Sequence, residues 1–185
     1  MSLFLAMFSF SLVMSISPGP VNMVILSSGA SYGVRKTFSF VSGASIGFTL
    51  LLLFIGLGFH KIIALYPDFL KYLSIAGSML IIYMGYLIAS SSSELNIEKQ
   101  NQPTFTQGFL LQWLNPKAWL ASVASVSLFS TPNSNQVFLT FSAVYFVVCY
   151  LSLFSWSVLG NKATLVLNSE LRLKIFNRFM GGLLI

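Results

Sequence analysis

Two proline interruptions hold the residues whose types and spacing best suit ligand binding. The first is the run Ser17-Pro18-Gly19-Pro20, with Asn22 two residues further on, inside a charge-free N-terminal segment. Proline lacks a backbone N–H and its ring clashes with the carbonyl four residues back, while glycine adds conformational freedom. We therefore expect a broken helix whose unpaired backbone groups could bind a ligand. A simple proline kink is the alternative interpretation.

The second interruption is Asn115-Pro116-Lys117, inside another apolar segment. A half-helix that begins at a proline presents free N–H groups and the positive end of its dipole, and both suit a carboxylate. Lys117 adds a full positive charge. If the helix spans a bilayer, a central lysine costs about 2.5–3.5 kcal/mol and so indicates a functional site. The alternative is that the helix starts later and Lys117 extends to the membrane interface.

Together the two interruptions predict a substrate-binding site for a small molecule with an anionic group. The candidate residues are Ser17, Pro18, Gly19, Pro20, Asn22, Asn115, Pro116 and Lys117. No residue is assigned a catalytic role. Cys149 is the single cysteine and His60 the single histidine, which argues against a dithiol redox centre, a metal site and any cofactor. His60 is expected at an interface, with proton sensing as the alternative.

The composition places these interruptions in a membrane protein. Of 185 residues, 56% are hydrophobic and 8% are charged, against about 25% charged in soluble domains. The mean hydropathy is +0.83. So few charges cannot provide the polar surface of a soluble domain, which excludes a soluble enzyme, a disordered chain and a nucleic-acid-binding protein. We expect the net charge of +6 to reflect basic loops on the cytoplasmic side.

Charge-free segments divide the chain into spans, because a spanning helix needs about 20 apolar residues. We predict five complete spans near residues 3–26, 37–58, 72–90, 107–130 and 136–160. A sixth begins near Phe179 and is truncated at Ile185. Most Lys and Arg residues follow spans 1, 3 and 5, whereas only Lys61 and Lys71 follow spans 2 and 4. The N-terminus is therefore predicted to lie outside the cytoplasm.

The predicted fold class is an all-α, polytopic transmembrane helical bundle, with one transport domain over residues 1–185. Residues 1–90 form the first half, residues 91–106 a linker, and residues 107–185 the second half. Three spans per half place the halves in opposite orientations, and the first helix of each half is broken. This pattern is typical of a 3+3 inverted repeat with a substrate site near the midplane.

Glycine and tryptophan residues have expected structural roles in this bundle. Gly43 and Gly47 form a small-xxx-small pair that lets helices approach closely. Trp113, Trp119 and Trp156 are expected mostly to face lipid or the interface. The alternative for Trp113 or Trp119, which flank the second interruption, is a place in the cavity wall.

The interruptions also carry a family resemblance. The run Ser17–Asn22 with the run Ser31–Arg35 resembles the first motif of the LysE/RhtB family of bacterial amino-acid exporters. The run Gln107–Ala118 is similar to the second motif, and the run Phe176–Gly182 to the start of the last helix. The resemblance covers the whole chain. Within the family it looks closest to the cysteine/O-acetylserine exporter branch, on residues 27–28, 43–48 and 111–113.

The resemblance implies a carrier in the bacterial inner membrane with a periplasmic N-terminus. It would export small amino acids or derivatives, of the cysteine/O-acetylserine or homoserine/threonine type, by alternating access driven by the proton gradient. The implied partners are the amino-acid substrate and the lipid bilayer, with a homo-oligomer left open and no nucleic acid. The competing hypothesis is a non-transporting membrane assembly subunit, which would not need Lys117.

Two features depart from the family pattern. Many members have an acidic residue in the second helix, but residues 43–53 contain none, and the four acidic residues of the chain fall in expected loops. Backbone carbonyls at half-helix C-terminal ends, Asn22, Asn115 or aromatic ring faces could replace a carboxylate as partners of the substrate ammonium. The last helix is also shorter than in the family.

Overall fold

The structure is a computed structural model, and every secondary-structure element among its described residues is helical. It describes residues 2–59, 68, 72, 75, 78–79, 82–83, 85–86, 102–130, 135–163 and 169–184. The predicted third span and the linker therefore lie mostly outside the described residues, as does His60. The all-α class is confirmed for the part of the chain that the structure describes.

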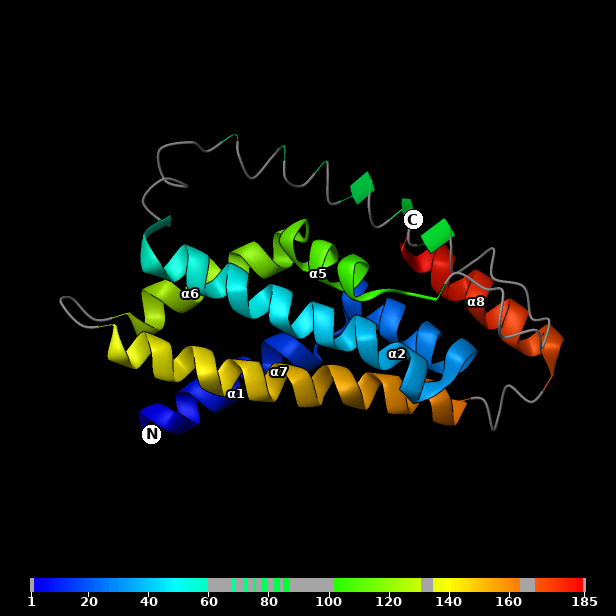
Figure 1. Ribbon diagram of the computed structural model, residues 1–185, viewed down its shortest axis with the longest axis horizontal. Helices are drawn as coiled ribbons and strands as arrows, with labels where there is room; N and C mark the ends of the chain where they lie inside the picture. The colour runs from blue at the N-terminus through cyan, green and yellow to red at the C-terminus, as the bar shows by residue number, and fades with distance from the viewer. Residues whose placement is uncertain are drawn as a thin grey trace.

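The described helices form one bundle, in which α2 and α7 run side by side (Figure 1). In chain order they are α1 (Leu3–Ile16), α2 (Pro20–Phe54), the π-helical η1 (Ile55–Phe59), α5 (Phe105–Trp113), α6 (Pro116–Phe129), α7 (Gln136–Ala163) and α8 (Glu170–Leu184). Among the described residues, two helical stretches are long and apolar enough to cross a membrane, Pro20–Gly58 and Gln136–Ala163. The α1 helix is apolar but shorter.

Both proline interruptions break the helices at the predicted places. The α1 helix ends at Ile16 and α2 begins at Pro20, while α5 ends at Trp113 and α6 begins at Pro116. Proline fits the first position of a helix because the N–H that it lacks would have no partner there. At each interruption one helix ends and a separate helix begins, with non-helical residues between them. The interpretation of the first interruption as a simple proline kink is therefore wrong.

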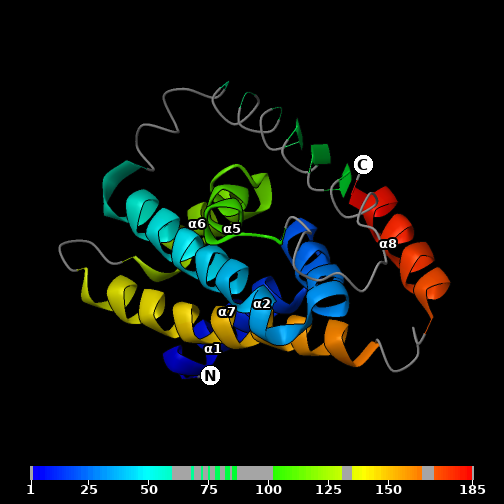
Figure 2. The same ribbon diagram turned by 45° about the vertical axis from the view of Figure 1, so that its right-hand side comes forward.

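A single residue, Gly33, joins the regions predicted as the first and second spans. Its φ of 78° and ψ of 169° interrupt α2, although the residues on both sides remain helical. Glycine adopts a positive φ without the steric cost of a Cβ atom. Figure 2 shows that the ribbon of α2 changes direction partway along its length. The sequence predicted a longer connection between residues 26 and 37, so the helices extend further toward the turn than expected.

Close helix contacts are made at glycine residues, as predicted for Gly43 and Gly47. A Cβ atom on Gly43 would collide with the backbone oxygen of Phe105, and one on Gly47 would lie 3.0 Å from the Cα of Phe109. In the part of α2 before Gly33, a Cβ atom on Gly160 of α7 would collide with the backbone of Leu26. These glycines let the backbones of α5 and α7 lie directly against α2.

The α8 helix begins nearer the N-terminus than the predicted start of the sixth span. It starts at Glu170. The sequence predicted a span that starts only near Phe179, because charged residues precede that position; these charged side chains occupy the first turns of α8. Buried Asn177 connects it to α2: its Oδ1 accepts from Ser27 Oγ at 3.0 Å, and its Nδ2 donates to Ser31 Oγ at 2.9 Å.

Five of the ten buried serine hydroxyls among the described residues bond within their own helix. Each donates to the carbonyl four residues earlier, which satisfies a polar group without any partner from another helix. Examples are Ser11 to Met7, Ser28 to Val24, Ser122 to Ala118, Ser125 to Ala121 and Ser142 to Phe138, with oxygen–oxygen distances of 2.6–2.9 Å. Three other buried serine hydroxyls, those of Ser15, Ser45 and Ser157, form no hydrogen bond with any described residue.

Candidate substrate-binding site

The first break leaves the N-terminus of α2 without a side-chain cap. Gly19 occupies the N-cap in an extended conformation, and it has no side chain to accept from the first N–H groups. The N–H of Met23 bonds to the carbonyl of Gly19 at 3.0 Å. The N–H groups of Val21 and Asn22, in contrast, have no acceptor within the part of the chain that the structure describes. Two backbone donors at the positive end of a helix dipole are thus available.

Asn22 bridges the first break instead of capping it. Its Nδ2 donates to the backbone carbonyl of Ser15 at 3.0 Å, which connects the start of α2 to the last turn of α1. Asn22 is 5% exposed, so this bond lies in the protein interior. We conclude that its side chain fixes the geometry of the break while its backbone N–H remains free.

The second break differs, because its helix is capped. Asn115 is the N-cap of α6: its Oδ1 accepts from the N–H of Lys117 at 3.1 Å, and its carbonyl accepts from the N–H of Ala118 at 2.9 Å. Asparagine is among the preferred N-cap residues for this reason. The prediction that both half-helices offer free N–H groups is therefore correct for α2 and wrong for α6.

Lys117 contacts the first break across the bundle. Its Nζ donates to Ser17 Oγ at 2.7 Å and to the carbonyl of Ser17 at 3.2 Å. Ser17 is the C-cap of α1, so the ammonium lies at the negative end of that helix dipole. The ammonium also lies beside the start of α2: a Cβ atom on Gly19 would be 3.4 Å from Nζ. The side chain thus points to the other break.

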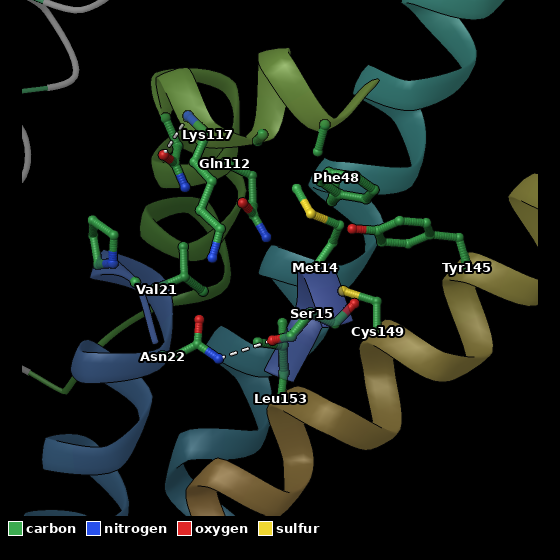
Figure 3. A pocket seen from close by; sticks show the side chains of 15 residues that line it. Met14, Ser15, Val21, Asn22, Phe48, Gln112, Lys117, Tyr145, Cys149 and Leu153 are labelled. Atoms are coloured by element: carbon green, nitrogen blue, oxygen red, sulfur yellow. Dashed lines mark hydrogen bonds between the residues drawn. The ribbon is translucent and has the colours of Figure 1, made fainter. Parts of the chain in front are cut away.

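A cavity lies between the two breaks (Figure 3). Helices α1, α2, α5, α6 and α7 all contribute to its wall. Its lining residues are Met14, Ser15, Gly19, Pro20, Val21, Asn22, Phe48, Gln112, Asn115, Lys117, Ala118, Ala121, Tyr145, Cys149 and Leu153. Five predicted site residues are in this lining, namely Gly19, Pro20, Asn22, Asn115 and Lys117. Ser17, Pro18 and Pro116 shape the breaks without lining the cavity.

Several lining residues were not predicted from the sequence. Gln112 is 6% exposed, and its amide forms no hydrogen bond with any residue in the described ranges. Tyr145 and Cys149 come from α7, one turn apart, and Ser15 from α1. A polar side chain three residues before a helix break was the available signal for Gln112. The other three gave no local signal, because only packing brings α7 and α1 to the cavity.

The cavity volume is about 40 Å³, which accommodates a few water molecules but not an amino acid. One wall is a stacked pair of rings, Phe48 and Tyr145, whose centroids are 4.4 Å apart with planes inclined by 22°. The structure therefore has a contracted site, and a larger ligand requires side chains or half-helices to move.

The tryptophans contribute to packing and not to the cavity wall. Trp119 is 3% exposed and its Nε1 donates to the carbonyl of Trp113 at 2.6 Å, so its predicted lipid-facing position is wrong. Trp156 donates from Nε1 to the carbonyl of Ile16 at 3.2 Å, near the C-terminal end of α1. Both indoles satisfy carbonyls that the helix ends leave without intrahelical partners.

Comparison with known proteins identifies the family. The sequence matches the family described as LysE type translocator over residues 12–185, which includes both breaks and α8. The chain belongs to the LysE type translocator family. It is therefore a membrane protein of a transporter family, in agreement with its composition and its two long apolar helices.

Curated relatives of this LysE translocator are named by their substrates. It is similar to proteins named cysteine/O-acetylserine efflux protein from Escherichia coli strain K12, Shigella flexneri serotype 5b and Shigella sonnei. Each is 31% identical over 133 residues, which cover 71% of this chain and 68% of the relative. No solved structure gives a significant match. Within the described ranges, no group of three His, Cys, Asp or Glu side chains could hold a metal ion.

Proposed function

We propose that this LysE translocator exports small amino acids or their derivatives across the bacterial inner membrane. Candidate substrates are of the cysteine/O-acetylserine or homoserine/threonine type. The names of its relatives support the first type, and membership of a translocator family supports transport. The cavity between two broken helices supports a site for a molecule with charged ends, because half-helix termini place partial charges inside an apolar bundle.

The observation that carries the proposal is the pairing of Lys117 with the uncapped start of α2. In our proposal the substrate carboxylate binds the Lys117 ammonium and the free N–H groups of Val21 and Asn22. A carboxylate accepts several charge-assisted hydrogen bonds, which are stronger than neutral ones. Its arrival would replace Ser17 Oγ as the acceptor for Lys117 Nζ and so loosen the contact between the breaks.

The substrate amino group needs an acceptor on the other side of the cavity. No Asp, Glu or His is among the cavity-lining residues of the described chain. Gln112 Oε1 is buried beside the cavity and has no competing donor within the described ranges, so we assign the ammonium to it. A neutral acceptor would bind the ammonium more weakly than a carboxylate, which favours release and suits a carrier.

Alternating access and proton coupling complete the proposal. The two half-helices that begin at Pro20 and Pro116 line one cavity, which favours an inverted repeat rocking around a central site, with the N-terminus in the periplasm. Since Lys117 is the charged member of the described lining, we propose that it carries the transferred proton. Its ammonium would bind the substrate, and its neutral amine would release it.

The test is amino-acid release from bacteria loaded with dipeptides. Cells that express this chain are compared with cells that express Lys117→Ala, and the matched control is Lys162→Ala, an exposed lysine in the last turn of α7. We expect faster release of one small amino acid with the original chain and the control, and background release with Lys117→Ala. If no version releases any amino acid faster at equal expression, the exporter proposal is wrong and an assembly subunit becomes the better hypothesis.

A further inference from the structure

The far end of the cavity, opposite Lys117, contains a buried hydroxyl without a hydrogen-bond partner among the described residues. Of the three buried serines in this condition, Ser15 is the one that lines the cavity. Ser15 lies on α1, one turn after Ser11, whose hydroxyl bonds to the carbonyl of Met7 at 2.7 Å. Ser15 is 6% exposed, yet its Oγ forms no hydrogen bond of acceptable length and angle with any described residue. An unpaired hydroxyl in an apolar interior is unfavourable, and the carbonyl one turn back would normally satisfy it.

The Ser15 hydroxyl lies where it could bind a ligand in the cavity. Ser15 lines the cavity together with Tyr145 and Cys149 of α7, and the three side chains face one another in Figure 3. Tyr145 and Cys149 are close enough to interact electrostatically with the Ser15 hydroxyl, and the Ser15 Oγ forms no geometrically defined hydrogen bond with either of them. Tyr145 is 2% exposed and Cys149 is 3% exposed. This end of the cavity is therefore polar at its surface and enclosed by apolar residues.

The two ends of the cavity thus differ in chemistry. At one end are Lys117 and the start of α2, with a positive charge and two backbone donors. At the other end are the neutral hydroxyls of Ser15 and Tyr145 and the thiol of Cys149, each able to donate and accept a hydrogen bond. A molecule with a carboxylate at one end and a small neutral polar group at the other could form hydrogen bonds at both ends of the cavity.

We propose that Ser15, Tyr145 and Cys149 form a specificity subsite for the substrate side chain. The subsite selects amino acids whose side chain carries an oxygen or sulfur atom at the γ position over aliphatic amino acids of equal size. The side-chain hydroxyl, thiol or ester oxygen bonds to Ser15 Oγ, which then no longer lacks a partner. An aliphatic side chain leaves these polar groups unsatisfied, and that loss is the source of the discrimination. This inference rests on the proposed function, because it assumes that the cavity binds an amino acid.

The aromatic packing around the subsite favours a small side chain. The stacked Phe48 and Tyr145 rings close the wall beside the subsite, and Tyr145 also contacts Phe10 and Phe141 edge-on, with centroid distances of 6.5 and 5.6 Å. Packing on several sides fixes the position of the Tyr145 ring and hence of its hydroxyl. A large side chain would have to displace this aromatic cluster, so the subsite excludes bulky amino acids by shape.

The test compares two substrates of nearly equal size in proteoliposomes that contain the purified full chain. Cysteine, kept reduced, carries sulfur at the γ position, whereas 2-aminobutyrate carries a methyl group there. The measured quantity is the ratio of their initial transport rates. We expect Ser15→Ala to lower the cysteine preference by about tenfold, the effect of one lost hydrogen bond to a buried group, while 2-aminobutyrate transport persists.

Two further variants keep this test decisive if Ser15→Ala folds poorly. Tyr145→Phe removes one hydroxyl, keeps the stacked ring and should also lower the cysteine preference. Ser11→Ala is the matched control: it removes a buried hydroxyl on the same helix that is already satisfied, and the ratio should not change. An unchanged ratio in both subsite variants, or an equal change in Ser11→Ala, would overturn the subsite. If the original chain transports neither substrate nor any other amino acid, the proposed function itself fails.

Discussion

Lys117 Nζ donates a 2.7 Å hydrogen bond to Ser17 Oγ, so the start of α6 is connected to the end of α1 although 100 residues separate them. The same ammonium contacts the carbonyl of Ser17, at the negative end of the α1 dipole. One side chain therefore joins the two breaks. Any movement that separates the start of α6 from the end of α1 must lengthen or replace this contact.

Removal of the Ser17 hydroxyl should weaken transport without abolishing it. In Ser17→Ala the Lys117 ammonium retains the backbone carbonyl but loses its shorter bond, so it is held less firmly beside the start of α2. We expect the rate of amino-acid release to fall by about threefold to tenfold. The control is Ser127→Ala, whose exposed hydroxyl bonds only within α6. A release rate equal to that of the original chain would show that the Ser17 hydroxyl has no part in positioning Lys117.

Replacement of Lys117 by arginine should separate binding from proton coupling. Arginine keeps the positive charge but does not release its proton in proteins. We expect Lys117→Arg proteoliposomes to exchange internal for external substrate at a measurable rate, while a pH gradient no longer drives accumulation. The original chain should do both, and a proton ionophore should remove its accumulation alone. Gradient-driven accumulation by Lys117→Arg would contradict the assignment of the proton to Lys117.

The cap on α6 should contribute measurably to stability. Asn115→Ala removes the acceptor for the N–H of Lys117, and loss of an N-cap costs about 1 kcal/mol. In a chain of this length such a loss lowers Tm by about 2–4 °C. The measurement is thermal unfolding of the purified protein in detergent. Asn115→Asp keeps an oxygen acceptor at the same position and should restore most of the Tm, so a Tm as low as that of Asn115→Ala would argue against the capping role.

The contact between α2 and α7 should tolerate no side chain at Gly160. A Cβ atom there would collide with the backbone oxygen of Leu26, and neither helix backbone can move aside locally. We expect Gly160→Ala to destabilise the protein by about 1–3 kcal/mol, the usual cost of an overpacked core. Gly182→Ala on α8 is the control, because no described atom outside its own stretch of helix lies within 4 Å of the added Cβ. Equal thermal stability of the two variants would disprove close packing at Gly160.

The hydrogen-bonded connection between α8 and α2 should depend on Asn177. Asn177→Leu preserves size but leaves the hydroxyls of Ser27 and Ser31 without this partner in a buried contact. We expect faster amide hydrogen exchange throughout α8, because local unfolding of that helix becomes less costly. Ile175→Val, on an exposed position of the same helix, should leave the exchange rates unchanged. The connection would be refuted by equal protection of α8 in both variants.

The sequence by itself determined the class of the protein and the places where its helices break. Few charges and long apolar segments require an apolar environment, and Pro20 and Pro116 act on their own backbone, so neither feature depends on distant residues. The glycine contact at Gly43 was predictable for the same reason, since spacing on one helix defines a face. Asparagine before Pro116 also signalled a capped helix. This cap is the reason why the prediction of free N–H groups at the start of α6 is wrong.

Only the tertiary structure decided which residues meet at the cavity. The rotation of each helix about its axis and its distance from its neighbours are set by packing of the whole bundle, and no local pattern specifies them. These two quantities direct Lys117 to Ser17, bring Gln112 into the wall, and place Ser15 beside Tyr145 and Cys149. The sequence therefore predicted where the chain could bind an anion, while packing determined the polar subsite at the other end.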